Sequence, residues 1–195
     1  MASGAIPVGL CSFSDETIAE AEQDLPRNLC PLIKSSYGFA KTQKCPFFYF
    51  SDLIIGETTC DGKKKMYEML GKIKDTYIME LPNRQSPMGR KLWREEIVAL
   101  KEKLEEKFGV TITEEKLREQ VKLSNQNRLA LRHFYELMKL DPPPMAGADL
   151  YSVLYGSSFK FERKKAIDEV NALTERIQKE YDEGNRPISK RPRIL

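Results

Sequence analysis

The chain has 195 residues, of which 41% are hydrophobic and 31% charged, a balance typical of globular proteins rather than disordered ones. Its 32 basic and 29 acidic side chains give a formal net charge of +3, too even a balance to indicate a nucleic-acid partner. No apolar stretch approaches the roughly 20 residues that span a bilayer, and the N-terminus lacks the features of a signal peptide, so we expect a cytoplasmic protein without membrane association.

Short apolar runs alternate with helical stretches through the first 85 residues. Strands are expected over residues 5–10, 53–55 and 77–81. A first helix is expected to follow an N-cap at Ser14 or Asp15 and to run to Glu22, and two more to cover residues 32–40 and 63–74. This alternation predicts an α/β domain with a parallel sheet, Rossmann-like or flavodoxin-like, in which ligands bind at the carboxyl ends of the strands.

Long amphipathic helices follow from about residue 86. The first carries an apolar stripe that includes Trp93 and ends at Gly109, which stands in the C-cap position. Thr113 can cap a second helix, which has to stop before Pro142, and a third is expected over residues 161–184. These patterns predict an all-helical domain inserted after the α/β domain.

Three parts are therefore expected: a partial α/β domain over residues 1–85, a helical domain over 86–184, and a segment over 185–195. The last segment is interpreted as a linker and, at residues 193–195, the first strand of a second α/β domain. A small sheet with an unpaired terminal strand would leave an edge and a face uncovered. We therefore expect the chain to be a fragment, truncated before that second domain.

Four cysteines lie in the first third of the chain. Cys30, Cys45 and Cys60 head Cys-Pro or Cys-Asp-Gly turns, and Cys11 follows an expected strand. Their separations of 19, 15 and 15 residues exclude a compact zinc finger, so a shared metal site would have to be assembled by the fold. In a reducing compartment such cysteines are free thiols, metal ligands or catalytic groups rather than disulfides. The alternative for each is a buried core residue.

Cys60 has a physical argument of its own. If Asp61 and Gly62 open a helix, the thiolate lies at a helix N-terminus, where free N–H groups and the macrodipole favour negative charge. Gly62 would allow a close backbone approach. The three lysines at 63–65 could offset the charge of an anionic ligand, and the alternative is a solvated first helical turn.

Other chemistries have little support in the sequence. His133 is the only histidine and lies among apolar helix residues, so neither a histidine-rich metal site nor a Cys-His nucleophile pair is indicated. The glycines match neither the dinucleotide-binding pattern nor the P-loop pattern, so we assign ATP hydrolysis to a partner. Glu57 and Asp61 flank Cys60 and could move protons there, although capping a turn is the alternative role.

Three long motifs carry a family resemblance: DLPRNLCPLIKSSYGFAKTQKCPFFYFSDLIIGETTCDGKKKMYEML, then YIMELPN, then DPPPMAG. They resemble the 2-hydroxyacyl-CoA dehydratase and benzoyl-CoA reductase superfamily, and within it most closely the double-cubane cluster protein branch. The resemblance extends over essentially the whole chain and corresponds to roughly the middle half of a family member.

The resemblance implies an iron-sulfur protein of two α/β domains with a helical insertion, the cluster lying between the α/β domains. It implies electrons delivered at very low potential by a separate ATP-hydrolysing iron-sulfur activator, and a homo- or heterodimer of family subunits. Dehydratase members remove water from a 2-hydroxyacyl-CoA through a ketyl radical. Members of the double-cubane branch reduce small molecules instead, with a larger, 8Fe-type cluster in place of a 4Fe-4S centre.

Residue by residue, the resemblance maps Cys30 and Cys60 onto two cluster ligands of the family. Cys45 matches a cysteine of the double-cubane branch. For Cys11 two interpretations stay open, a metal ligand and a core residue. The implied function is the cluster-binding part of an ATP-activated, low-potential reductase of the double-cubane type. The alternatives are a subunit of a 2-hydroxyacyl-CoA dehydratase and a non-catalytic truncated scaffold. Because further ligands would lie beyond Leu195, the chain alone is expected to be inactive.

Overall fold

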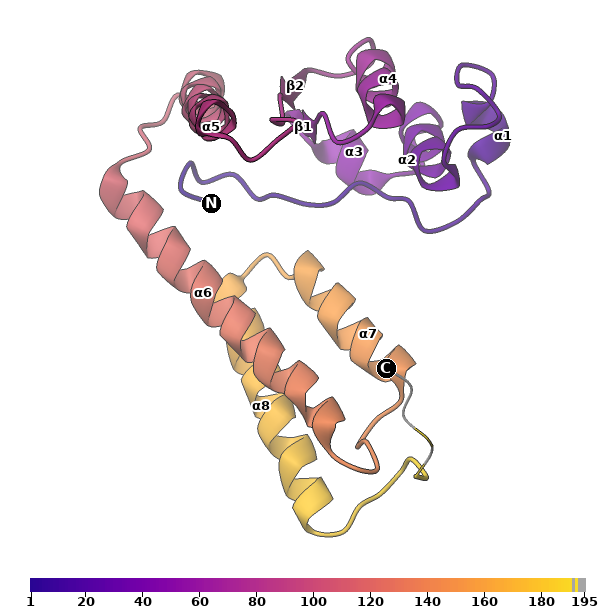
Figure 1. Cartoon of the computed structure of the whole chain (residues 1–195), viewed down its shortest axis with the longest axis vertical. Coiled ribbons are helices and arrows are strands. Elements are labelled where there is room, and N and C mark those ends of the chain that lie inside the picture. The colour runs from indigo at the N-terminus through magenta and orange to yellow at the C-terminus, as the bar shows by residue number, and fades with distance from the viewer. Residues whose placement is uncertain (191, 193–195) are drawn as a thin grey trace. The chain divides into compact units, whose positions relative to one another are not determined.

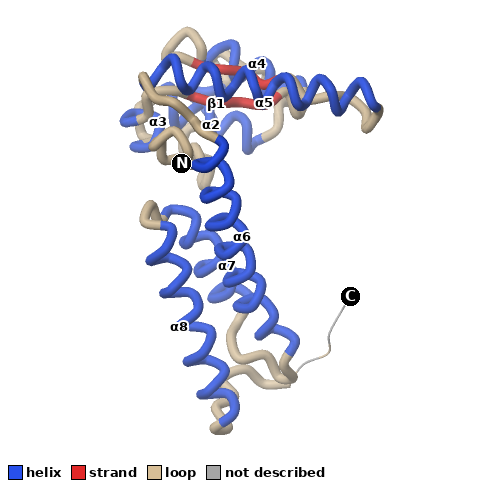
Figure 2. The backbone as a smooth tube through the Cα atoms, turned by 90° about the vertical axis from the view of Figure 1, so that its left-hand side faces the viewer, coloured by secondary structure: helices blue, strands red, loops and turns tan. Residues whose placement is uncertain are grey.

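The computed structural model describes residues 1–190 and 192, and it divides the chain into two compact units (Figure 1). One unit spans Pro7–Thr111, and the other combines Met1–Ile6 with the chain from Ile112 onward. The strands lie in the first unit, and the second is built from helices (Figure 2). The chain is thus of the mixed α/β type. The strand expected at 193–195 lies outside the described residues.

The sheet of the first unit consists, in the described residues, of β1 (Ile54–Glu57) and β2 (Thr76–Met79). The strands run parallel, with Ile54 opposite Thr76 and Glu57 opposite Met79. The helix α4 (Asp61–Leu70) connects them, as a parallel pair requires. The predicted parallel pairing is confirmed, whereas a larger Rossmann-like sheet stays a prediction.

The strand expected at residues 5–10 does not form, so this prediction is wrong. The segment has no regular structure, and Ile6 is 57% exposed. Alternation of apolar residues is a weak signal over six residues, and Pro7 lacks the N–H group that a sheet ladder needs. Cys11 consequently follows an irregular segment rather than a strand.

Three short helices precede the sheet in sequence: α1 (Ile18–Ala21), α2 (Pro31–Lys41) and α3 (Pro46–Phe50). The predicted helix at 32–40 is confirmed, but the cap at Ser14 or Asp15 is wrong because α1 starts after Thr17. The Thr17 hydroxyl instead donates to the carbonyl oxygen of Ser35 at 3.3 Å, inside the contact between α1 and α2. The helix α3, at 46–50, was not foreseen.

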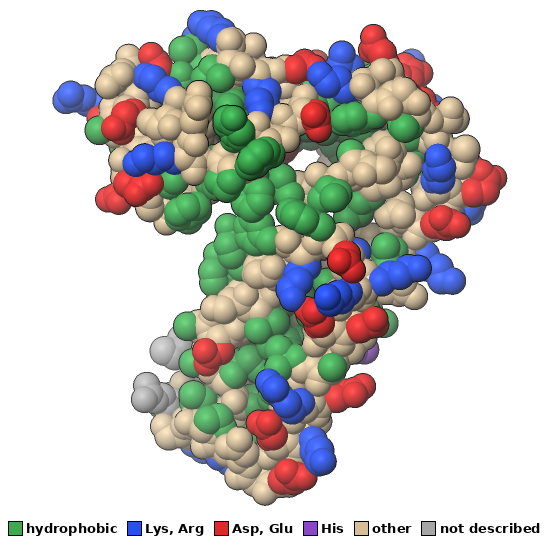
Figure 3. Space-filling view, turned by 180° about the vertical axis from the view of Figure 1, so that it is seen from behind, with side chains coloured by type: hydrophobic (Ala, Val, Ile, Leu, Met, Phe, Trp, Pro, Cys, Tyr) green, Lys and Arg blue, Asp and Glu red, His purple; other side chains and the backbone are tan. Residues whose placement is uncertain are grey.

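The core of this unit lies between α1, α2, α3, α4 and β1. Its largest fully buried side chains include Phe39, Leu70 and Cys45. Apolar side chains also reach the surface, as the space-filling view shows (Figure 3). The most exposed of them in this unit are Phe13, Leu32, Tyr49, Phe50 and Met88.

The long helix α5 (Pro87–Phe108) ends as predicted at Gly109, which adopts the left-handed conformation with φ of 61°. It belongs to the first unit, whereas the sequence pattern places the domain boundary near residue 85. Side chains of α5 hold it beside the sheet: Lys107 pairs with Asp75 at 2.8 Å, and Glu96 accepts from the backbone N–H of Glu80 at 3.1 Å. The sequence cannot show this packing because the helix itself looks like its successors.

The second unit contains α6 (Glu114–Glu136), η1 (Leu137–Lys139), α7 (Gly147–Gly156), η2 (Ser157–Phe159) and α8 (Arg163–Asp182). The predicted cap is confirmed, since the Thr113 hydroxyl accepts from the N–H of Lys116 at 3.3 Å. Helices α6 and α8 pack together around Phe134 and Val170, while α7 was not foreseen. Among the described residues, no helix is both long and apolar enough to cross a membrane.

A glycine sets the spacing between α1 and α2. A Cβ added at Gly38 would lie 2.1 Å from the backbone oxygen of Thr17, which cannot move independently of α1. We expect Gly38→Ala to destabilise the first unit by about 1–3 kcal/mol, because overpacking outweighs the better helix propensity of alanine. Urea unfolding followed by circular dichroism measures the change. Gly9→Ala, at a position with open space in the same unit, is the control and should be near neutral.

Tyr37 makes stability depend on alkaline pH. Burial and its hydrogen bond to Asp24 (2.8 Å) raise the pKa of Tyr37 from 10.0 to about 12. Because the pKa of Tyr37 is higher in the folded than in the unfolded protein, its contribution to the free energy of unfolding is complete below pH 10.0. That contribution is lost as the pH rises to about 12. Below this pH range we expect the unaltered chain to have a free energy of unfolding on the order of 1–2 kcal/mol higher than the Tyr37→Phe variant. The difference should shrink as the pH rises through the range. Tyr49→Phe, which removes the hydroxyl of an exposed side chain in the same unit, is the control and should leave the free energy of unfolding nearly unchanged.

Candidate functional site

Three of the four cysteines stand at the N-cap of a helix, and two of these, Cys30 and Cys60, are exposed. Cys30 is the N-cap of α2, where Pro31 supplies the fixed φ suited to the first helical residue. Cys60 is the N-cap of α4, three residues after the carboxyl end of β1, and Asp61 adds an acidic residue to the first turn. Both thiols are free and exposed. Each lies at a helix N-terminus, where backbone N–H groups lack an intrahelical partner.

The fold brings these two helix N-termini together. A Cβ added at Gly62, in the first turn of α4, would lie 2.8 Å from Cδ1 of Ile33 and 2.9 Å from Cδ1 of Leu29. Leu29 precedes Cys30, and Ile33 lies in the first turn of α2. Gly62 is thus approached closely by side chains of the segment around Cys30 rather than by backbone. The sequence shows that Gly62 is unusual but not what it contacts.

The lysines after Cys60 are paired with carboxylates. Lys63 contacts Glu57 at 3.2 Å, Lys64 contacts Asp61 at 3.4 Å, and Lys65 contacts Glu68 at 2.9 Å. Burial opposes the charge of Lys63, but its hydrogen bond to Glu57 and the negative charges around it outweigh this and raise its pKa.

The charge of Cys60 is the smallest of the causes that act on the pKa of Lys63. Lys64 and Lys65 pair with exposed carboxylates of their own helix and resemble an ordinary solvated surface.

Cys11 and Cys45 lie together in the core, exposed by only 6% and 1%. The sulfur of Cys45 accepts the backbone N–H groups of Cys11 and Phe48, both at 3.3 Å. Burial and the hydrogen bond to Cys45 raise the pKa of Cys11 to about 12. Both thiols are thus held in a very different environment from Cys30 and Cys60, and their part in a cluster stays a prediction.

The donor set agrees in kind with an iron-sulfur cluster, which is held by cysteine thiolates. Within residues 1–190 and 192, however, no three His, Cys, Asp or Glu side chains are gathered so that they could hold a metal ion. The role of Cys30 and Cys60 as cluster ligands therefore stays a prediction. The sequence pattern does not single out Lys34, which the structure buries in α2.

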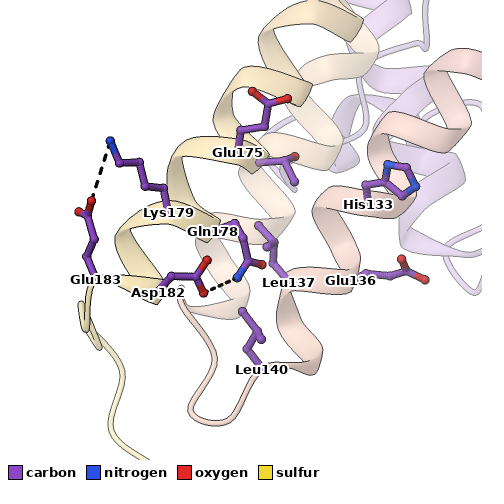
Figure 4. Close-up of a pocket in the computed structure, with 10 residues that line it drawn as sticks. His133, Glu136, Leu137, Leu140, Glu175, Gln178, Lys179, Asp182 and Glu183 are labelled. Atoms are coloured by element: carbon purple, nitrogen blue, oxygen red, sulfur yellow. Dashed lines mark hydrogen bonds and ion pairs between the residues drawn. The ribbon is translucent and has the colours of Figure 1, made fainter.

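The second unit has an open groove of about 920 Å³ between α6 and α8 (Figure 4). His133 and several acidic side chains line it, and two of these carboxylates have partners within α8: Glu183 pairs with Lys179, and Asp182 accepts from Gln178. None of the four cysteines lies in this unit. The groove is a solvated helix surface, in agreement with the reading of His133 as an ordinary helix residue.

Comparison with known proteins places these features in a family. A sequence model of the family described as 2-hydroxyglutaryl-CoA dehydratase, D-component, matches residues 1–195. The protein of Escherichia coli (strain K12) named "Putative dehydratase subunit YjiM" is 54% identical over 196 residues, which cover 100% of this chain and 51% of that protein. The chain thus spans about half the length of this curated relative. It belongs to the 2-hydroxyglutaryl-CoA dehydratase D-component family, within the 2-hydroxyacyl-CoA dehydratase superfamily.

Proposed function

We propose that the chain is the iron-sulfur cluster-binding segment of a subunit of this superfamily, with Cys30 and Cys60 as thiolate ligands. The observation that carries the proposal is the contact of Gly62 with Leu29 and Ile33, which joins the two helix N-termini that bear these thiols. When bound, such a cluster supplies one-electron chemistry at low potential.

The residues of this chain would hold and tune the cluster. Backbone N–H groups at the starts of α2 and α4 would stabilise the thiolates of Cys30 and Cys60. Lys63 would offset negative charge beside Cys60 while remaining paired with Glu57. Hydrogen bonds and charge near the sulfurs are among the features that set a cluster's reduction potential.

We assign the subunit to dehydration of a 2-hydroxyacyl-CoA, with electrons delivered by an ATP-dependent iron-sulfur activator and with a second family subunit as partner. The printed name of the relative, a dehydratase subunit, supports this assignment. So does the state of Cys45, whose sulfur is 1% exposed and already accepts two backbone N–H groups. A dehydratase-type cluster needs fewer thiolates than the double-cubane type.

The second candidate is a double-cubane protein that reduces small molecules. The observation that favours it is the presence of two further thiols, Cys11 and Cys45, within the same unit as Cys30 and Cys60. A larger cluster would require both buried thiols to leave their present hydrogen bonds. The two candidates therefore differ in whether Cys45 binds iron.

Anaerobic reconstitution tests the ligand assignment. The chain is incubated with ferrous iron and sulfide in the presence of a small thiol, which can complete the coordination that the chain leaves open. We expect bound iron and visible charge-transfer absorbance, and loss of most of both in Cys30→Ser and in Cys60→Ser. Iron, sulfide and absorbance are measured after gel filtration.

Thr113→Ser is the matched control, because it changes another helix N-cap but keeps a hydroxyl there. It should bind as much iron as the unaltered chain. A colourless unaltered chain, or a Cys30→Ser/Cys60→Ser double variant with undiminished iron, would contradict the proposal.

The iron count separates the two candidate functions. A dehydratase-type centre predicts about four irons per chain, unchanged in Cys45→Ser. A double-cubane centre predicts clearly more than four, falling when Cys45 is replaced. Because Cys45 is buried, the folded state of the variant is checked by circular dichroism before iron is measured.

A further inference from the structure

One face of α2 forms a row of polar contacts with the chain that precedes it. Lys34, Tyr37 and Lys41, spaced by three and four residues, project from the same side of the helix. Tyr37 donates to Asp24 at 2.8 Å, and Lys41 pairs with the same carboxylate at 2.7 Å. Lys34 contacts Glu22 at 2.7 Å. The row therefore fastens the segment around residues 20–27 along the length of α2.

Lys34 differs from the other members of this row. It is only 6% exposed, although lysine is almost never buried without a partner. Besides Glu22, its ammonium donates to the backbone oxygen of Arg27 at 2.8 Å. The Nε atom of Arg27 lies 3.7 Å from the same carboxylate, so Glu22 contacts the side chains of both Lys34 and Arg27. Lys34 is therefore the member of the row whose partner, Arg27, is nearest in sequence to Cys30.

A short path leads from Lys34 to the two thiols. Arg27 lies inside a turn in which the N–H of Leu29 donates to the oxygen of Pro26 at 3.1 Å. The next residue is Cys30, and the side chain of Leu29 packs against Gly62, two residues from Cys60. The hydrogen bond to the Arg27 carbonyl therefore holds the turn, and the turn carries Leu29 to its contact with Gly62 in α4.

We propose that Lys34 is a positioning residue for the two-thiol site: its ammonium, held by Glu22 and the Arg27 carbonyl, holds the 26–30 turn and with it Leu29 against Gly62, which keeps together the two helix N-termini that carry Cys30 and Cys60. A buried ion pair contributes little net stability, since desolvation offsets its attraction, but it specifies one arrangement of the groups it joins. The inference rests on the proposed function for the identity of the ligand, not for the placement of the thiols.

The test compares two lysine substitutions on one face of one helix. Lys34→Met and Lys41→Met each remove an ammonium and keep an apolar stem of similar length. The native chain is treated with a short bis-maleimide, and mass spectrometry measures the ratio of Cys30–Cys60 bridged product to singly modified product. We expect Lys34→Met to lower this ratio by on the order of tenfold and Lys41→Met to leave it unchanged, because loss of positioning cuts the effective concentration of one thiol at the other.

Iron retention against a chelator gives a second readout. We expect it to weaken roughly 10–100-fold in Lys34→Met alone, as for other residues that orient metal ligands. Should the unaltered chain bridge its thiols yet bind no iron, the positioning role would stand and the cluster assignment would fail. Bridging in folded Lys34→Met equal to that of the unaltered chain would overturn the positioning role, as would failure of the unaltered chain to bridge.

Glu22→Gln covers the case in which Lys34→Met does not fold. The amide oxygen can still accept from Lys34, so the fold is retained while the ionic part of the contact is lost. A lowered bridging ratio in this variant supports the proposal, and an unchanged ratio contradicts it. Urea unfolding of each variant separates lost stability from lost positioning.

Discussion

The candidate site depends on one close approach, the packing of Leu29 and Ile33 against Gly62. A helix N-terminus has unpaired N–H groups and a partial positive charge, so two of them at one place repel unless something negative lies between them. A pair of thiolates, or an anionic cluster bound to them, meets this requirement. Gly62 permits the close packing of the two helix N-termini, and a bound anionic ligand would offset their positive partial charges.

Burial divides the four cysteines into two kinds. Cys30 and Cys60 stand at the N-cap positions of helices of 11 and 10 residues and remain exposed, without a capping hydrogen bond from the side chain. Cys11 and Cys45 are buried together in the core, where the backbone N–H of Cys11 donates to the sulfur of Cys45. Cys45 is also the N-cap of α3. The same residue type thus carries the candidate chemistry in one pair and fills the core in the other.

The polar side chains Lys34, Tyr37 and Lys41 on one face of α2 connect this helix to the chain that precedes it. These side chains tie α1 and the following turn to α2, while the close contact at Gly38 sets the distance between the two helices. Lys34 is placed within this scaffold rather than in the site itself. A rigid support of this kind is what keeps metal ligands in position before the metal binds.

The sequence alone determined the helix at 32–40, the helix end at Gly109 and the cap at Thr113, because each depends on local chemistry. It also predicted the parallel pairing of β1 with β2, because a helical pattern separates the two strands. Its motifs also identified the family. Tertiary structure alone decided that residues 5–10 form no strand, that α5 joins the sheet, that Cys11 and Cys45 are buried together, and that Lys34 reaches the Arg27 carbonyl. These outcomes depend on contacts between residues distant in sequence, and no local pattern encodes which surfaces will meet.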